Sequence, residues 1–166
     1  MKKLGPVRYG IVRFRLGPNF ARPDLALDAI GVDVTFLIER QVFMLRILHL
    51  EDSKEDAMLI EHTVKSEGIK ATFKVVKNRQ DFISECEKEQ FDVVLADSST
   101  TDFDGISALK MVRQKNPHTP FICLSGRQDP SHIKECFDAG ATDYVSKNDL
   151  SPLITTLRIE AERVGN

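Results

Sequence analysis

The stretch FDVVLADSSTTDFDG, residues 91–105, decides how the rest of the chain is interpreted. The apolar run from Val93 to Ala96 has the length and the β-branched content of a strand buried on both faces. It stops at Asp97, four hydroxyl residues follow, and Asp104–Gly105 is a typical start for a helix. A fully buried strand needs helices on both sides of its sheet. The stretch therefore predicts a parallel α/β fold with a carboxylate at the end of a core strand.

The same alternation of short apolar runs and amphipathic stretches extends over residues 45–166. Strands are expected at 45–50, 70–76, 91–96, 119–125 and 142–146. Helices are expected between them at 54–67, 79–89, 105–115, 130–140 and from Ser151 onward. Ser53, with Asp56 three residues later, is the expected cap of the first helix, Asn78 of the second and Asp129, before Pro130, of the fourth. Gly68, Asn116–Pro117 and Gly140 are expected to stop the first, third and fourth helices. The last helix is expected to turn Ile154, Leu157, Ala161 and Val164 inward.

Five strand–helix units predict a doubly wound, five-stranded parallel sheet with helices on both faces. Crossovers in such sheets are right-handed, which leaves few topologies. The flavodoxin-like strand order 2-1-3-4-5 suits five units. That order makes 70–76 and 142–146 the edge strands, and both are more polar than the other three.

Residues 1–43 differ from residues 44–166 in charge and pattern. The first segment has seven Lys or Arg against four acids, whereas the second has sixteen against twenty-one. The first segment has two Gly–Pro pairs and no clear period, so it is expected to be a flexible extension or sequence upstream of a true start at Met44. A basic docking arm is the alternative. The domain itself is expected over 44–166.

Composition restricts the partners and the compartment. With 166 residues, 42% hydrophobic residues and a net charge of −2, the chain can form one core, and its charge does not favour nucleic acid or an anionic membrane as partner. Three cysteines without a CxxC pair argue against a disulfide framework or a zinc site, and a reducing cytoplasm is expected. No apolar run approaches the length of a membrane span.

Polar side chains follow four of the five expected strands. Glu51 and Asp52 follow the first strand, Asp97 ends the third, Ser125 ends the fourth and Lys147 follows the fifth. Ligands of open α/β sheets bind beyond the carboxyl ends of the strands, so these groups are expected to converge. Crowded carboxylates favour a cation such as Mg²⁺ or Mn²⁺, and a lysine beside it favours a phosphoryl group. Asp97 would then be metal ligand and nucleophile together.

In this order the residues resemble the receiver domain of bacterial two-component response regulators. The resemblance covers about residues 45–163 and rests on LEDSKED (50–56), DVVLAD (92–97) followed by FDG, ICLSG (122–126), AGATDYVSK (139–147) and the closing helix. It implies that Asp97 is the phospho-accepting aspartate and that Mg²⁺ is bound by two acids and a main-chain carbonyl beside it. Those ligands are Asp52 directly, Glu51 through water, and the carbonyl of Ser99.

The resemblance also implies a switch and partners. Ser125 would move to bond the phosphoryl group, Lys147 would pair with it, and Tyr144 would swing inward when Ser125 moves. The donor would be a phosphohistidine on a histidine kinase or a phosphotransfer protein. A downstream protein would bind the face made by the fourth helix, the fifth strand and the last helix. Beyond phosphorylation from a donor and slow loss of the phosphoryl group, no enzymatic activity is expected.

Two positions depart from the pattern of the family. Many receivers have proline where Thr101 stands, and they have proline in a cis bond after the lysine, where this chain has Asn148. The loop either holds a strained cis Lys147–Asn148 bond or takes another path. The chain ends soon after the last helix, so a stand-alone or excised receiver without a DNA-binding domain is expected.

Two other functions are compatible with parts of the pattern. A degenerate receiver would be a binding module that is never phosphorylated. A phosphatase of the haloacid-dehalogenase type also uses a strand-end aspartate with Mg²⁺. That enzyme requires a second acid two residues later, where Ser99 stands, and its aspartate follows the first strand of the domain instead of the third.

Overall fold

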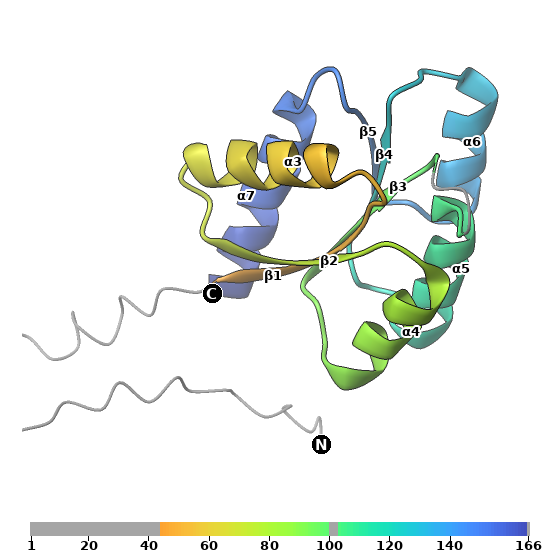
Figure 1. The fold of residues 1–166 in the computed structure, drawn as a ribbon, viewed down its shortest axis with the longest axis horizontal. Coiled ribbons are helices and arrows are strands. Elements are labelled where there is room, and N and C mark those ends of the chain that lie inside the picture. The colour runs from red at the N-terminus through yellow and green to blue at the C-terminus, as the bar shows by residue number, and fades with distance from the viewer. Residues whose placement is uncertain (1–43, 100–102, 166) are drawn as a thin grey trace, which may run out of the picture. The chain divides into compact units, whose positions relative to one another are not determined.

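The computed structural model describes residues 44–99 and 103–165 (Figure 1). The expectations for residues 1–43 and for Thr101 concern positions outside this described part. Strands and helices alternate along it, beginning with β1 (Leu45–Leu50) and α3 (Lys54–Ser66). The remaining elements are β2 (Ala71–Val76), α4 (Arg79–Lys88), β3 (Val93–Asp97), α5 (Gly105–Lys115), β4 (Phe121–Ser125), α6 (Pro130–Asp138), β5 (Asp143–Ser146) and α7 (Ser151–Gly165).

The five strands form one parallel sheet in the order β2-β1-β3-β4-β5, which confirms the predicted topology. The polar strands β2 and β5 are its edges. At the carboxyl ends Leu50 lies opposite Ala96, and Asp97 lies opposite Leu124. The carboxyl ends of β1, β3, β4 and β5 therefore lie side by side along one border of the sheet, called its carboxyl edge below.

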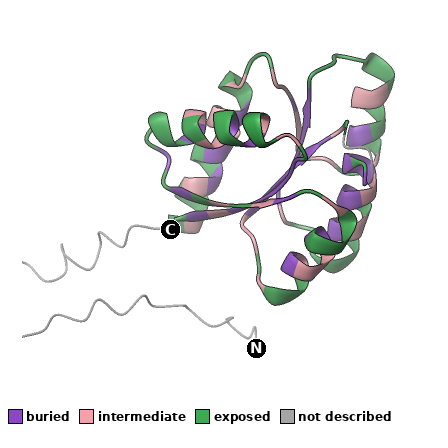
Figure 2. Cartoon of the chain, in the orientation of Figure 1, coloured by how far each residue is buried: buried purple, intermediate pink, exposed green. Residues whose placement is uncertain are grey.

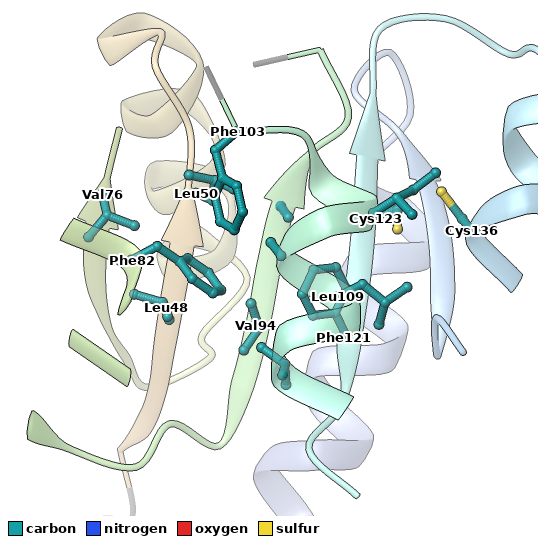
Figure 3. Packing of buried hydrophobic residues seen from close by; sticks show 14 residues of the cluster. Leu48, Leu50, Val76, Phe82, Val94, Phe103, Leu109, Phe121, Cys123 and Cys136 are labelled. Carbon is teal, nitrogen blue, oxygen red and sulfur yellow. The ribbon is translucent and has the colours of Figure 1, made fainter. Parts of the chain in front are cut away.

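The sheet has a separate hydrophobic layer on each face. On one face α4, α5 and α6 pack against the strands around Leu48, Phe82, Leu109 and Phe121, as Figure 3 shows. On the other face α3 and α7 cover a layer that includes Ile47. The central strands β3 and β4 are buried along their whole length, and the exposed residues lie on the outer sides of the helices (Figure 2). Burial on both faces explains the continuous apolar runs of these strands.

Helix ends follow the predicted capping residues. The side chain of Ser53 accepts the N–H of Asp56, and that of Asn78 accepts the N–H of Asp81. Asp129 caps α6 with Pro130 at its first turn. Beyond α3, Gly68 has a φ of 77°, a left-handed conformation that glycine adopts without steric strain.

Several sequence expectations differ from the structure in detail. β4 begins at Phe121 instead of residue 119, β2 and β5 begin one residue later than expected, and α6 ends at Asp138 instead of residue 140. β3 begins at Val93 instead of residue 91, and the carboxylate of Asp92 just before it accepts the main-chain N–H of Arg46 at 2.8 Å. In α7 the buried residues are Leu153, Leu157 and Glu160, so the inward stripe lies about one position from the predicted one. Ile154 still packs partly against the core from the edge of the stripe.

Within residues 44–99 and 103–165, none of the helices combines the length and the apolar character that crossing a membrane requires.

Candidate functional site

Acidic side chains and one lysine meet at the carboxyl edge of the sheet. Glu51 and Asp52 follow β1, Asp97 ends β3, and Lys147 follows β5. The ligand oxygens of Glu51, Asp52 and Asp97 all lie within 4.8 Å of one another. Strand order brings these residues together although they are far apart in the sequence.

The ammonium group of Lys147 is the centre of the site. Its Nζ donates to Glu51 Oε2 at 2.5 Å, to Asp56 Oδ2 at 2.7 Å and to Asp97 Oδ2 at 2.8 Å. Burial alone would lower the pKa of Lys147, but hydrogen bonds to Asp56, Asp97 and Glu51 outweigh it and raise the pKa above its ordinary value. The lysine is therefore a fixed positive charge at this edge.

Asp97 is 3% exposed and accepts hydrogen bonds on both carboxylate oxygens. The main-chain N–H of Ser99 donates to Oδ1 at 2.9 Å, and the Ser99 hydroxyl lies 2.8 Å from Oδ1 and 3.0 Å from Oδ2. Burial opposes ionisation of this group. The hydrogen bonds from Lys147 and Ser99 together outweigh it and lower the pKa of Asp97, so the carboxylate is ionised at neutral pH.

Glu51 is fully buried, and both of its oxygens are engaged. Oε1 accepts the N–H of Ser53 at 3.0 Å, and Oε2 accepts from Lys147. Burial raises the pKa of Glu51 in spite of these bonds. Asp52 is exposed, next to Glu51. The site thus combines two buried carboxylates with one that faces solvent.

The donor set of this acidic cluster fits a hard divalent cation. Carboxylate oxygens are the ligands that Mg²⁺ and Mn²⁺ prefer, and one open side leaves positions for water. Lys147 is the one cation in hydrogen-bond contact with the cluster in the described part of the chain. Glu51, Asp52 and Asp97 could therefore hold such an ion. Ser99 lies beside them, and the ligand role of its carbonyl stays a prediction.

Ser125 ends β4, whereas Tyr144 lies inside β5, opposite Cys123 of β4. Ser125 is buried, and its Oγ accepts the N–H of Arg127 at 3.1 Å. The hydroxyl of Tyr144 donates to the carbonyl of the same residue, Arg127, at 2.9 Å. The ring of Tyr144 meets His132 of α6 edge to face, with 6.0 Å between the ring centroids. The two predicted switch residues therefore share one backbone partner.

The turn after Lys147 takes a path without a cis bond, since no described peptide bond is cis. The N–H of Asn148 donates to Ser146 Oγ at 3.2 Å, and the N–H of Asp149 donates to the Ser146 carbonyl at 3.1 Å. These bonds close a tight turn that delivers Lys147 to the site. Of the two paths left open by the sequence, the structure has the unstrained one.

His49 lies on β1, two residues before Glu51, and its side chain is in the core. It is fully buried, and neither ring nitrogen has a hydrogen-bond partner among the described residues. Burial and the nearby Lys147 lower the pKa of His49 to about 4, so the ring is neutral at pH 7. Lys147 therefore remains the positive charge of the site.

Asp56 is the site residue that sequence reasoning missed. The sequence placed it in the first turn of a helix, as the partner of the Ser53 cap, and its carboxylate instead reaches Lys147. A signal was present in the sequence, because Asp56 lies four residues after Asp52, in the first turn of the helix that follows the Glu51–Asp52 pair. Nothing in the sequence determined the direction of its side chain.

Comparisons with known proteins point to one family. The sequence model of the family described as response regulator receiver domain matches residues 47–158. A curated relative, the two-component response regulator ORR1 of Oryza sativa subsp. japonica, is 27% identical over 123 residues, which cover 68% of this chain and 53% of ORR1. The chain spans about half the length of this relative. Of four other curated relatives that it matches, it spans between 20% and 53% of the length.

Solved structures have the same fold. The receiver domain of the Francisella response regulator 1452 has a TM-score of 0.62 and 28% identity, and the match covers 72% of this chain and 98% of that one. The receiver domain of the sensor histidine kinase PA1611 from Pseudomonas aeruginosa has a TM-score of 0.61 and 24% identity, covering 75% of this chain and 100% of that one. That structure has a magnesium ion coordinated in its active site cleft.

Proposed function

The chain belongs to the response regulator receiver domain family, and from this premise we propose that it accepts a phosphoryl group on Asp97. The donor is the phosphohistidine of a histidine kinase or of a histidine phosphotransfer protein. The observation that carries the proposal is the 2.8 Å contact between the Lys147 ammonium and the buried, ionised carboxylate of Asp97. This pair places a nucleophile and a group that binds phosphoryl oxygens side by side.

The proposed reaction transfers one phosphoryl group from nitrogen to oxygen. A carboxylate oxygen of Asp97 forms a bond to phosphorus while the P–N bond to the donor histidine breaks, and the electron pair of that bond returns to the imidazole. Negative charge in the transition state lies on the phosphoryl oxygens, and Lys147 and Ser125 donate to them. Water later hydrolyses the acyl phosphate, which regenerates the carboxylate and releases phosphate.

The acidic cluster would hold Mg²⁺ or Mn²⁺ through Glu51, Asp52 and Asp97, with the Ser99 carbonyl as a further ligand. When bound, the ion supplies positive charge that offsets the charge on the phosphoryl oxygens. The all-oxygen donor set of this chain supports the assignment, and so does the magnesium ion of the PA1611 receiver domain.

The output of the proposed reaction is a change in protein–protein contacts on the face made by α6, β5 and α7. Phosphorylation adds negative charge at Asp97 and draws the hydroxyl of Ser125 toward it. Because Ser125 and Tyr144 both bind the backbone of Arg127, a movement of Ser125 alters the loop that holds the Tyr144 ring. A downstream protein that binds this face would detect the difference.

The phosphatase alternative has no support in the geometry. The position two residues after Asp97 is Ser99, whose hydroxyl and N–H both bond the carboxylate, so a second acid is missing there. Asp97 also ends the central strand of the sheet, third in chain order. A degenerate receiver remains the outcome of a negative phosphorylation test.

Incubation with Mg²⁺ and acetyl phosphate is expected to add one phosphoryl group to the protein. The reason is that the small donor supplies a phosphoryl group to an ionised carboxylate beside a lysine. Intact-mass spectrometry measures the gain. Addition of EDTA is expected to prevent it, and hydroxylamine is expected to remove it because acyl phosphates are labile. Absence of any gain in mass, or a gain that is unaffected by EDTA, contradicts the proposal.

Mg²⁺ is also expected to raise the melting temperature of the protein. Three carboxylates repel one another in the metal-free fold, and a cation bound only to the folded state stabilises it by about 2.7 kcal/mol at a hundred times its dissociation constant. Thermal unfolding followed by circular dichroism measures the shift. Asp52→Asn is the matched variant, since it removes an exposed ligand without changing the core. An equal shift in both proteins rules out binding at this cluster.

A further inference from the structure

We propose that Asp56 is a positioning residue for Lys147, an assignment that rests on the proposed phosphoryl transfer to Asp97. Asp56 Oδ2 accepts from Lys147 Nζ at 2.7 Å, a contact as short as the one between Lys147 and Asp97. Asp56 belongs to α3, whereas the other two partners of the lysine follow or end strands. The helix thus contributes a fourth acid to the site.

The local structure of α3 directs Asp56 toward the lysine. Ser53 caps the helix by accepting the N–H of Asp56 at 3.2 Å. In a complete capping box the acid three residues after the cap accepts the N–H of the cap residue in return. Here the N–H of Ser53 donates to Glu51 at 3.0 Å instead. The carboxylate of Asp56 is therefore not used by the box, and it bonds to Lys147.

The partners of Lys147 differ in what phosphorylation does to them. An ammonium group has three donors, and Glu51, Asp56 and Asp97 accept all three. Asp97 becomes the acyl phosphate, and Glu51 belongs to the cluster that would hold the cation. Asp56 is outside that cluster and outside the reaction. It is the partner that keeps its charge and its place while the contacts of the other two change.

Burial is consistent with this role. The side chains of Glu51 and Asp97 are 0% and 4% exposed, whereas that of Asp56 is 44% exposed. Asp56 therefore holds the ammonium from the solvent side, toward the open edge where a donor enters. Without it, Lys147 can turn down toward the buried acids and away from an incoming phosphoryl group.

The test compares Asp56→Asn with Glu55→Gln, because Glu55 is an exposed acid in the same first turn of α3. Initial rates of labelling by acetyl phosphate with Mg²⁺ are expected to fall about tenfold in Asp56→Asn, less than the hundredfold that misplacement of a reacting group can cause. Asp56→Glu is expected to recover part of the rate. Glu55→Gln is expected to change it less than about twofold, as surface charges do.

A double-mutant cycle shows whether Asp56 acts through Lys147. In the Lys147→Gln background, Asp56→Asn is expected to have no further effect on the labelling rate. The same cycle on unfolding by urea without Mg²⁺ is expected to show a coupling of about fivefold in the unfolding constant. Equal effects of Asp56→Asn and Glu55→Gln, faster labelling of Asp56→Asn, or the lack of coupling in either cycle overturns the role.

Labelling of the wild-type protein distinguishes a failure of the proposed function from a failure of the role of Asp56. If the wild-type protein is not labelled at all, phosphoryl transfer to Asp97 is wrong, and a role in that transfer is overturned with it. In that case the unfolding cycle still reports whether Asp56 and Lys147 form a structural pair. If the wild type is labelled and Asp56→Asn is labelled at the same rate, only the role of Asp56 is wrong.

Discussion

Replacement of Asp97 by asparagine is expected to abolish phosphoryl labelling, with a rate more than about 100-fold below that of the wild-type protein. An amide cannot form the acyl phosphate, whereas its size and its carbonyl oxygen preserve the contact with Ser99. The fold is therefore expected to remain, and circular dichroism checks it. The measurement is the gain of one phosphoryl group with acetyl phosphate and Mg²⁺, followed by intact-mass spectrometry over time.

A matched control for this variant is Asp138→Asn on α6. Asp138 is an exposed aspartate whose ion pair with Lys134 lies on the surface, so its replacement is expected to leave labelling unchanged. Persistent labelling of Asp97→Asn at the wild-type rate would disprove the assignment of the acceptor. The chemistry of the label identifies the cause, because hydroxylamine cleaves an acyl phosphate and leaves a phosphoserine, for example at Ser99, intact.

Replacement of Lys147 by glutamine is expected to have two large effects. The labelling rate is expected to fall by about 10²- to 10³-fold, because the ammonium that offsets charge on the phosphoryl oxygens is gone. The free energy of unfolding without Mg²⁺ at pH 7 is expected to fall by about 3 kcal/mol, because the buried carboxylates of Glu51 and Asp97 lose their cation. Urea unfolding followed by circular dichroism measures the second effect.

The stability loss in Lys147→Gln depends on pH in a defined direction. In the wild-type protein the pKa of Asp97 is below its ordinary value of 3.8, so its ionisation stabilises the fold above that pH and the contribution is lost as pH falls through the lowered pKa. Without the lysine, only the hydrogen bonds from Ser99 oppose burial, so the pKa of Asp97 is expected to be higher than in the wild-type protein. The stability difference between variant and wild type is therefore expected to shrink as the pH falls from 7 toward the pKa of Asp97 in the variant.

Lys65→Gln is the control for the loss of a lysine charge. Lys65 pairs with Glu61 one turn away on the exposed side of α3, and such pairs contribute about 0.5 kcal/mol or less. Equal losses of stability in Lys65→Gln and Lys147→Gln would show that Lys147 is an ordinary surface lysine. Restoration of the stability of Lys147→Gln by Mg²⁺ would show instead that a cation can replace its charge in the cluster.

The capping contact at α3 shows how far local sequence reasoning extends. Ser53 was identified as a cap from its position before an amphipathic stretch, and its contact with Asp56 follows from backbone geometry over three residues. Where the carboxylate of Asp56 points is not a local matter, because Lys147 lies 91 positions later in the chain. The strand order that brings Asp56 and Lys147 together is predictable from the sequence. Whether the carboxylate of Asp56 bonds to Lys147 or to the N–H of Ser53 depends on how side chains from different elements pack.

Two further features depended on tertiary contacts. The sequence left the backbone path after Lys147 open, and it misplaced the inward face of α7. The sequence allowed a cis or another path at Asn148, and hydrogen bonds to Ser146 close the observed turn. In α7, Leu153 and Ile154 are adjacent apolar residues that both fit a helical stripe. A rotation of the helix by about one residue selects between them, and packing against β1 and α3 determines that rotation.

The sequence by itself determined the five-stranded parallel sheet and the carboxyl ends at which the polar residues meet. Hydrophobic runs of defined length, caps at helix starts and the right-handed crossover leave few topologies, and the predicted strand order is one that suits five units. Only the tertiary structure decided which acids bond the lysine, that Glu51 is fully buried while Asp52 faces solvent, and that Ser125 and Tyr144 share Arg127. These features depend on distances between side chains from different strands and helices, and such distances are fixed only when the elements pack.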